Sequence, residues 1–184
     1  MMGGIGSGKS FIAKLFKHPI FNADQEVNKV YRKNKNCYNQ LKKRLPKFIK
    51  SFPIKKSELI EAVSSNRKNI KIISSIVHPI VRKRMVKFLS QNRNSQMVVL
   101  DIPLLIENKL NKKGDILIFI DSKKSDVLKK LTKRKNFNSK LFKKFKKIQL
   151  PIDYKKRKAH FIIKNDFTKK SVKIGVNKIL NQIA

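Results

Sequence analysis

The chain has 184 residues, 40% of them apolar, which suits one globular domain with a buried core. No apolar run approaches the roughly 18 residues that a membrane span needs. No basic-then-apolar secretion signal is seen at the N-terminus. The single cysteine excludes an internal disulfide framework and is typical of a reducing compartment. We therefore expect a cytoplasmic protein without a membrane partner.

The net charge is extreme, since 46 basic residues face 11 acidic ones to give +35. Such a charge is typical of nucleic-acid binding. However, 38 of the basic residues are lysine and 8 are arginine, and the lysines are spread along the whole chain. Specific phosphate and base recognition relies more on arginine's planar fork. We interpret the charge as a solvated surface and expect no specific nucleic-acid partner, only nonspecific polyanion binding at low salt.

Residues 3–10 read Gly-Gly-Ile-Gly-Ser-Gly-Lys-Ser, a complete G-x-x-x-x-G-K-S phosphate-binding loop. Its backbone N–H groups can surround phosphate oxygens, and a helix expected over 10–16 directs its positive end at them. Lys9 would contact the β- and γ-phosphates, and the Ser10 hydroxyl is a natural Mg²⁺ ligand. The motif therefore predicts binding of ATP and Mg²⁺. The predicted ATP-binding residues here are Gly4, Ile5, Gly6, Ser7, Gly8, Lys9, Ser10 and Phe11.

A phosphate-binding loop normally follows a buried parallel strand. Only Met1 and Met2 precede Gly3, so the sequence predicts that the first strand is missing. A start codon assigned too late would explain this, and upstream sequence coding for a short apolar run would support that explanation. A truncated and inactive remnant is the alternative.

The first half of the chain reads mostly as helix. Residues 20–24 form a short extended run, and 25–45 have a polar helical pattern. A loop bracketed by prolines follows at 46–53. Residues 57–92 are helical again, and Pro79 predicts a break between two helices.

The second half alternates between strands and helices. Apolar runs predict buried strands at 97–102, 116–120 and 161–163. The helices are expected at 125–133, 138–149 and 170–183. This alternation predicts an α/β fold with a parallel sheet.

Six motifs together resemble one enzyme family. They are GGIGSGKS (3–10), NAD (22–24), HP (78–79), DIPLLIEN (101–108), LTKR (131–134) with Gln149 after it, and AHFIIKN (159–165). Their order and spacing resemble the dephospho-coenzyme A kinases, over essentially the whole chain. The resemblance implies a P-loop NTPase fold with three α/β/α layers. It also implies ATP-dependent phosphorylation of the ribose 3′-hydroxyl of dephospho-CoA, the final step of coenzyme A biosynthesis.

The resemblance further implies a single domain over 1–184. Its core would be 1–28 with 96–184, its helical CoA-binding lobe about 29–95, and its lid about 122–150. We expect a monomer.

The resemblance assigns catalysis to Asp24, Lys9 and Arg134. Asp24 would accept or orient the proton of the attacking hydroxyl, or it could instead cap a helix that starts at Gln25. Arg134 in the lid would stabilise developing charge. Asp101 ends a buried strand, where it could reach Mg²⁺ through water or simply cap the strand.

Substrate binding is assigned by the same resemblance. Pro103, Leu104, Leu105 and Glu107 match the segment that lines the acceptor site, although Leu104 and Leu105 could equally be plain core. His78 matches the lobe that closes over coenzyme A and is not expected to be catalytic. Asn165 would bind the adenine base or turn the chain.

Some positions depart from the family pattern. Asn22 replaces an aspartate, Lys56 an arginine, and His160 another aspartate. Other readings remain: another P-loop small-molecule kinase with a different acceptor, or a nucleic-acid-binding ATPase driven by the charge. Acceptor preference, and stimulation by DNA or RNA, would separate them.

Overall fold

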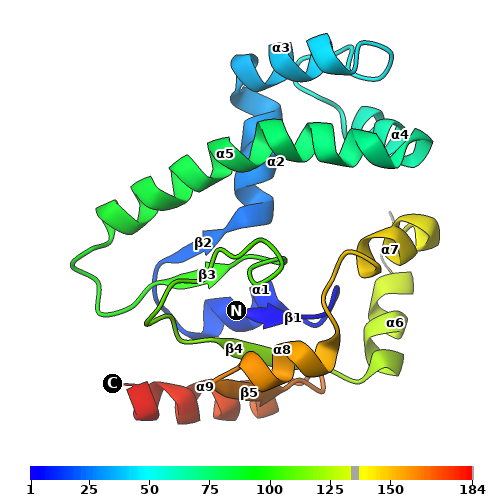
Figure 1. Ribbon diagram of the computed structural model, residues 1–184. Coiled ribbons are helices and arrows are strands. Elements are labelled where there is room, and N and C mark those ends of the chain that lie inside the picture. The colour runs from blue at the N-terminus through cyan, green and yellow to red at the C-terminus, as the bar shows by residue number, and fades with distance from the viewer. Residues whose placement is uncertain (134–136, 184) are drawn as a thin grey trace. The chain divides into compact units, whose positions relative to one another are not determined.

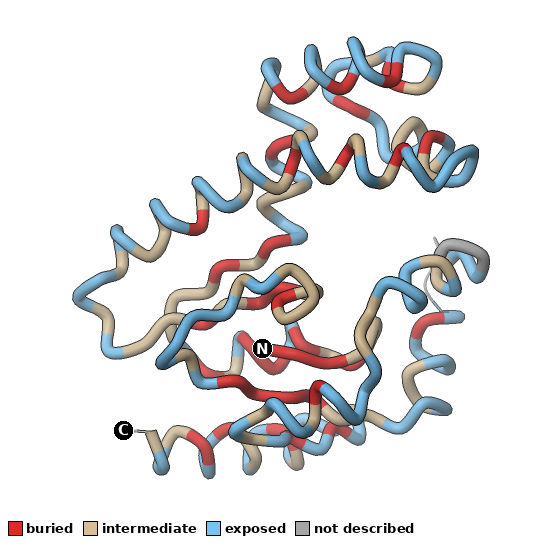
Figure 2. The backbone as a smooth tube through the Cα atoms, viewed as in Figure 1, coloured by how far each residue is buried: buried red, intermediate tan, exposed pale blue. Residues whose placement is uncertain are grey.

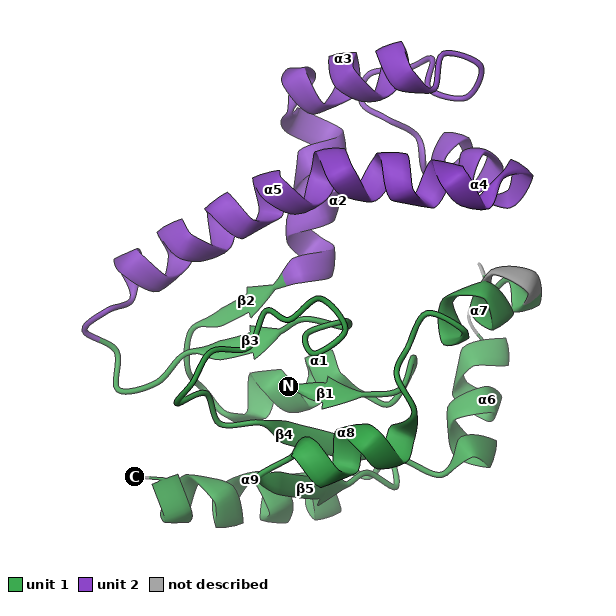
Figure 3. Cartoon of the chain, in the orientation of Figure 1, with its two compact units in different colours: residues 1–22, 95–184 green, residues 23–94 purple. Residues whose placement is uncertain are grey.

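The computed structural model describes residues 1–133 and 137–183 (Figure 1). It divides into two compact units, coloured separately in Figure 3. Unit 1 comprises Met1–Asn22 and Ser95–Ala184, and unit 2 comprises Ala23–Asn94. Among the described residues, none of the helices has both the length and the apolar character that crossing a membrane requires.

The strands described in unit 1 are short and pair in parallel, as the sequence predicts. They are β1 (Met2–Gly3), β2 (Ile20–Asn22), β3 (Val99–Asp101), β4 (Ile118–Asp121) and β5 (Phe161–Lys164). One sheet has the order β1-β4-β5 and the other pairs β2 with β3. The amino group of Met1 donates a hydrogen bond to the Leu100 carbonyl at 2.8 Å, so the start of the chain lies beside β3. This contact joins the two sheets.

The expectation that the first strand is missing is wrong. β1 is only two residues long, but it pairs with β4, with Met2 opposite Phe119 and Gly3 opposite Ile120. Met1 and Met2 are both buried. The strand is held by its backbone pairing with β4, and the Met1 side chain just before it packs in the core that contains Ile118 and Ile120.

Unit 1 has five helices among its described residues. They are α1 (Lys9–Leu15), α6 (Lys124–Thr132), α7 (Ser139–Lys146), α8 (Ile152–Lys158) and α9 (Lys169–Ile183). Of these, α1, α8 and α9 contact the strands. Ile118 and Ile120 share a core with α1 and with the buried face of α9. Since strand side chains alternate between faces, Phe119 points to the other side. There the Lys156 ammonium of α8 lies 5.9 Å from its ring centre, which gives three layers.

Unit 2 is helical. It consists of α2 (Ala23–Lys33), α3 (Lys35–Arg44), α4 (Lys56–Ser65) and α5 (Arg67–Gln91). Its core surrounds Val30, Leu41 and the free thiol of Cys37, all three of which have no exposed surface. The red segments of Figure 2 show the buried positions along these helices. Burial raises the pKa of the Cys37 thiol to about 11.

Two predicted helix boundaries in unit 2 are wrong. The helix expected over 25–45 is divided at Asn34, whose side chain accepts a hydrogen bond from the Cys37 N–H at 2.8 Å and starts a new helix. The break expected at Pro79 lies instead at Asn66, which caps α5 in the same way. α5 runs through Pro79, because proline removes only one helical donor and packing maintains the rest.

Candidate active site

The phosphate-binding loop has the geometry its glycines allow. It connects β1 to α1, and the Gly8 carbonyl accepts hydrogen bonds from Phe11 and Ile12, both at 3.1 Å. Gly8 has φ 88°, in the left-handed region that favours glycine. A Cβ there would lie 2.5 Å from Nδ2 of Asn165, so any larger residue would have to displace the Asn165 amide. The predicted loop is therefore present and tightly packed.

The Lys9 side chain folds back over this loop. It donates to the carbonyls of Gly3 at 3.2 Å and Gly4 at 2.8 Å, and the residue is buried. A phosphate is a stronger partner than a neutral carbonyl, because the hydrogen bond then joins two charged groups. The side chain is thus held beside the loop that would surround the anion.

The Ser7 carbonyl ties the loop to two strand ends. It accepts hydrogen bonds from Ser122 Oγ at 3.0 Å and from Asn165 Nδ2 at 2.8 Å. These residues directly follow β4 and β5. Asn165 Oδ1 in turn accepts from the Phe167 N–H at 2.8 Å. Asn165 therefore supports the loop, a role that the sequence did not predict, while its contact with adenine stays a prediction.

Oxygen ligands suitable for Mg²⁺ gather next to the loop. The Asn22 amide at the end of β2 donates to Asp101 Oδ2 at 2.6 Å and lies 3.4 Å from Ser10 Oγ. Asp101 is buried at the end of β3. The Asp101 carboxylate and the Ser10 hydroxyl, both close to the Asn22 amide, are suitable ligands for a Mg²⁺ ion whose other ligands are water and phosphate oxygens. Within residues 1–133 and 137–183, no cluster of three or more His, Cys, Asp or Glu side chains is arranged to hold a metal ion by itself.

The segment after β3 forms consecutive turns. The Leu110 N–H donates to the Leu105 carbonyl at 2.9 Å, and Leu105 is buried. The predicted acceptor residues Pro103 and Leu104 are half-buried in the first turn. The Glu107 carboxylate forms an ion pair with Lys155.

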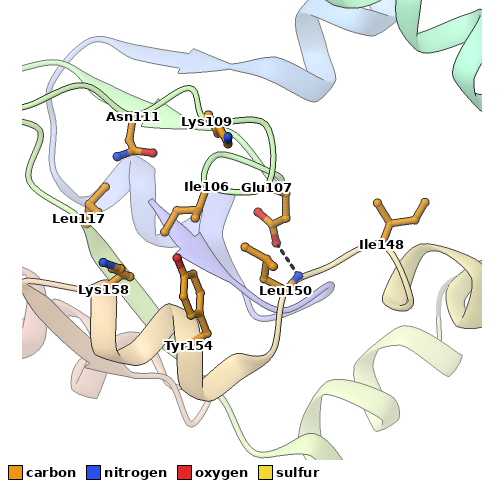
Figure 4. Close-up of a pocket in the computed structure, with 9 residues that line it drawn as sticks. All are labelled: Ile106, Glu107, Lys109, Asn111, Leu117, Ile148, Leu150, Tyr154 and Lys158. Atoms are coloured by element: carbon orange, nitrogen blue, oxygen red, sulfur yellow. Dashed lines mark hydrogen bonds between the residues drawn. The ribbon is translucent and has the colours of Figure 1, made fainter.

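Glu107 also accepts a hydrogen bond from the Leu150 N–H at 3.1 Å, which Figure 4 shows as a dashed line. It forms part of the wall of a cavity of about 580 Å³. The residues lining this cavity are Ile106, Glu107, Lys109, Asn111, Leu117, Ile148, Leu150, Tyr154 and Lys158.

Two predicted residues belong to unit 2. Asp24 lies in the first turn of α2, which begins at Ala23 directly after β2, so it does not cap a helix starting at Gln25. His78 lies half-buried within α5. Burial, and then the positive charge of Arg82, lower its pKa, which favours neutral imidazole.

Unit 2 also contains Glu26 of α2, a carboxylate to which no sequence motif points. It pairs with Lys29 at 2.6 Å and with Arg84 of α5 at 3.0 Å. Burial opposes its charged form, but these partners hold the pKa of Glu26 below its usual value. Arg134, the predicted lid arginine, lies outside the described residues; α6 ends shortly before it and α7 begins shortly after.

A phosphate loop between a parallel strand and a helix, with Ser10 and Asp101 beside it, defines a P-loop phosphotransfer site. The family model for dephospho-CoA kinase matches residues 1–171. The chain therefore belongs to the dephospho-CoA kinase family.

Individual relatives agree with this assignment. A dephospho-CoA kinase from Wolbachia sp. subsp. Brugia malayi is 32% identical over 100% of this chain and 96% of its own length. One from Bacillus anthracis is 31% identical over 99% and 94%.

Two solved structures share the fold. The TT1252 protein of Thermus thermophilus matches with a TM-score of 0.82 at 22% identity, covering 100% of this chain and 95% of that one. A dephospho-CoA kinase from Campylobacter jejuni matches with a TM-score of 0.66 at 22% identity, covering 100% and 96%. The three layers and helical unit described above are thus an architecture found in solved proteins.

Proposed function

We propose that this chain transfers the γ-phosphoryl group of ATP to the ribose 3′-hydroxyl of dephospho-CoA, giving coenzyme A and ADP. The observation that carries the proposal is the phosphate loop, with Lys9 buried beside it and Asp101 buried at the end of β3. Membership of the dephospho-CoA kinase family supports the choice of acceptor. We also take the protein to be cytoplasmic and monomeric.

The nucleotide side of the reaction depends on unit 1. The loop N–H groups would bind the phosphates, and Lys9 would move from the Gly3 and Gly4 carbonyls to the β- and γ-phosphates. Ser10 directly, and Asp101 through water, would hold Mg²⁺, which when bound neutralises charge on the β- and γ-oxygens. The Asn22 amide would keep the Asp101 carboxylate in place.

The acceptor side depends on Asp24 and on the turns after β3. Asp24 would take the proton from the 3′-hydroxyl as its oxygen attacks the γ-phosphorus, while the bond to the β-phosphate oxygen breaks and ADP leaves. Pro103 and Leu104 would contact dephospho-CoA, His78 would contact it from the helical unit, and Arg134 would stabilise charge in the transition state.

The test is ADP release by the purified chain with Mg²⁺-ATP, with and without dephospho-CoA. We expect strong stimulation by dephospho-CoA and a product heavier by one phosphate, placed on the 3′-oxygen by phosphorus NMR. AMP, shikimate, DNA and RNA serve as comparison acceptors or activators. Turnover that responds to one of these, and not to dephospho-CoA, would contradict the proposal.

A further inference from the structure

The ion pair between Glu107 and Lys155 is buried. The side chains are 8% and 3% exposed, whereas the nearby pair of Lys156 with Asp121 is 35% and 32% exposed. Glu107 also accepts the backbone hydrogen bond from Leu150. The Glu107 carboxylate therefore pairs with the buried Lys155 ammonium and also accepts a hydrogen bond from the partly buried Leu150 N–H.

A buried ion pair of this kind adds little to the free energy of unfolding. Removing two charges from water costs about as much as their attraction returns, and apolar residues of the same volume often do as well. A buried pair does fix geometry, because neither charge can leave its partner without a large penalty. The role of the Glu107–Lys155 pair should therefore be to hold two segments of the chain together.

The pair joins two segments that are distant in the sequence. Glu107 lies in the turns that follow β3 and contain Pro103 and Leu104. Leu150 and Lys155 lie just before and within α8, on the stretch of chain that returns from α7. Figure 4 shows the Glu107 carboxylate directed from its loop toward this stretch.

We propose that Glu107 is a positioning residue: through Lys155 and Leu150 it holds the 102–108 loop against the start of α8, and so fixes the dephospho-CoA site. The inference rests on the proposed function for the identity of the acceptor. Glu107 then acts on the acceptor through the loop, and its carboxylate does not itself contact the reacting atoms.

The main test uses the double variant Glu107→Met/Lys155→Met, which removes both charges and the acceptor of the Leu150 N–H and nearly preserves volume. Lys156→Met is the matched control, since it removes a partly exposed ion pair from the same helix. We expect the double variant to raise KM for dephospho-CoA about tenfold or more, with KM for ATP within about twofold of the wild-type value. The control should leave both constants unchanged. Equal rises in both KM values, or none, would overturn the proposal.

A second measurement is independent of activity. Hydrogen exchange should show faster exchange of the Leu150 and Leu110 amides in the double variant and not in Lys156→Met. Unchanged protection would refute the link even if the wild-type enzyme used another acceptor, so failure of this inference and of the proposed function can be told apart. If the double variant does not fold, Glu107→Asp, which shortens the reach by one methylene, should give the same two effects.

Discussion

Lys9 is the residue on which phosphoryl transfer should depend most directly. Replacing it with alanine removes the ammonium that we propose moves from the Gly3 and Gly4 carbonyls to the phosphates. We expect Lys9→Ala to lower turnover by roughly a thousandfold or more, to the limit of detection in an ADP-release assay. The fold should survive, because the Gly3 and Gly4 carbonyls can bind water instead.

Lys14→Ala is the matched control, since Lys14 is an exposed lysine of the same helix. It should keep full activity and the same circular dichroism spectrum. If Lys9→Ala also retained turnover within a few fold of wild type, the phosphate loop would not be the catalytic nucleotide site.

Asp24 offers a test of proton transfer. Asparagine preserves the shape of the side chain but cannot accept the proton, so we expect Asp24→Asn to reduce kcat by about 10²- to 10⁴-fold. Because the loop and Lys9 remain, the Kd for a nonhydrolysable ATP analogue should change little. A loss of ATP affinity as large as the loss of kcat would contradict the role proposed for Asp24.

For single residues, the sequence predicted those whose role depends on their immediate neighbours in the chain. The phosphate loop could be identified because eight consecutive residues carry the whole signal. The hydrogen bonds of Ser122 and Asn165 to Ser7, and the pair of Glu107 with Lys155, could not, because the partners meet only after the strands have assembled. The family resemblance pointed to Glu107 and Asn165, but no local pattern in the sequence identifies the partners with which they bond.

Among the elements, α4 depends on one carboxylate at its first turn. Glu58 accepts hydrogen bonds from the N–H groups of Lys50, Ser51 and Lys55 and from the Ser51 hydroxyl. Glu58→Ala would leave these donors to water and release the preceding loop. We expect the free energy of unfolding to fall by about 1–3 kcal/mol, measured by urea denaturation.

Glu61→Ala on the same helix is the control, because Glu61 is exposed. Its effect should stay within about 0.5 kcal/mol. Equal losses for the two variants would mean that helix charge, and not the loop contacts of Glu58, sets the stability of this region.

Element types were easier to predict than element boundaries. The strands at β3, β4 and β5 were predicted because each is an uninterrupted apolar run, and α9 because its apolar residues repeat with helical spacing. α8 was missed, since seven mostly charged residues show no such repeat. β1 and the passage of α5 through Pro79 were also mispredicted, because tertiary packing there outweighs the local signal.

For the whole molecule, the charge of +35 has a thermodynamic consequence. Lysines that greatly outnumber carboxylates repel one another in the compact state more than in the extended chain. Salt screens this repulsion, with a Debye length near 10 Å at 0.1 M. We expect Tm to rise by several degrees between about 50 mM and 500 mM NaCl.

Circular dichroism or differential scanning calorimetry at neutral pH would measure this rise. Sulfate should act at lower concentration than chloride, because it is divalent and is also excluded from protein surfaces. A Tm that stayed level or fell with NaCl would show that the lysines are neutralised in some other way.

Cys37 gives the helical unit a built-in chemical reporter. Its thiol is enclosed in the unit 2 core and has a pKa raised to about 11, so at neutral pH it is both inaccessible and almost entirely protonated. An alkylating reagent can modify it only during the intervals when the helices around it have separated. Since no other cysteine competes, the mass of the intact chain would record, over time, how often this unit opens, with and without dephospho-CoA present.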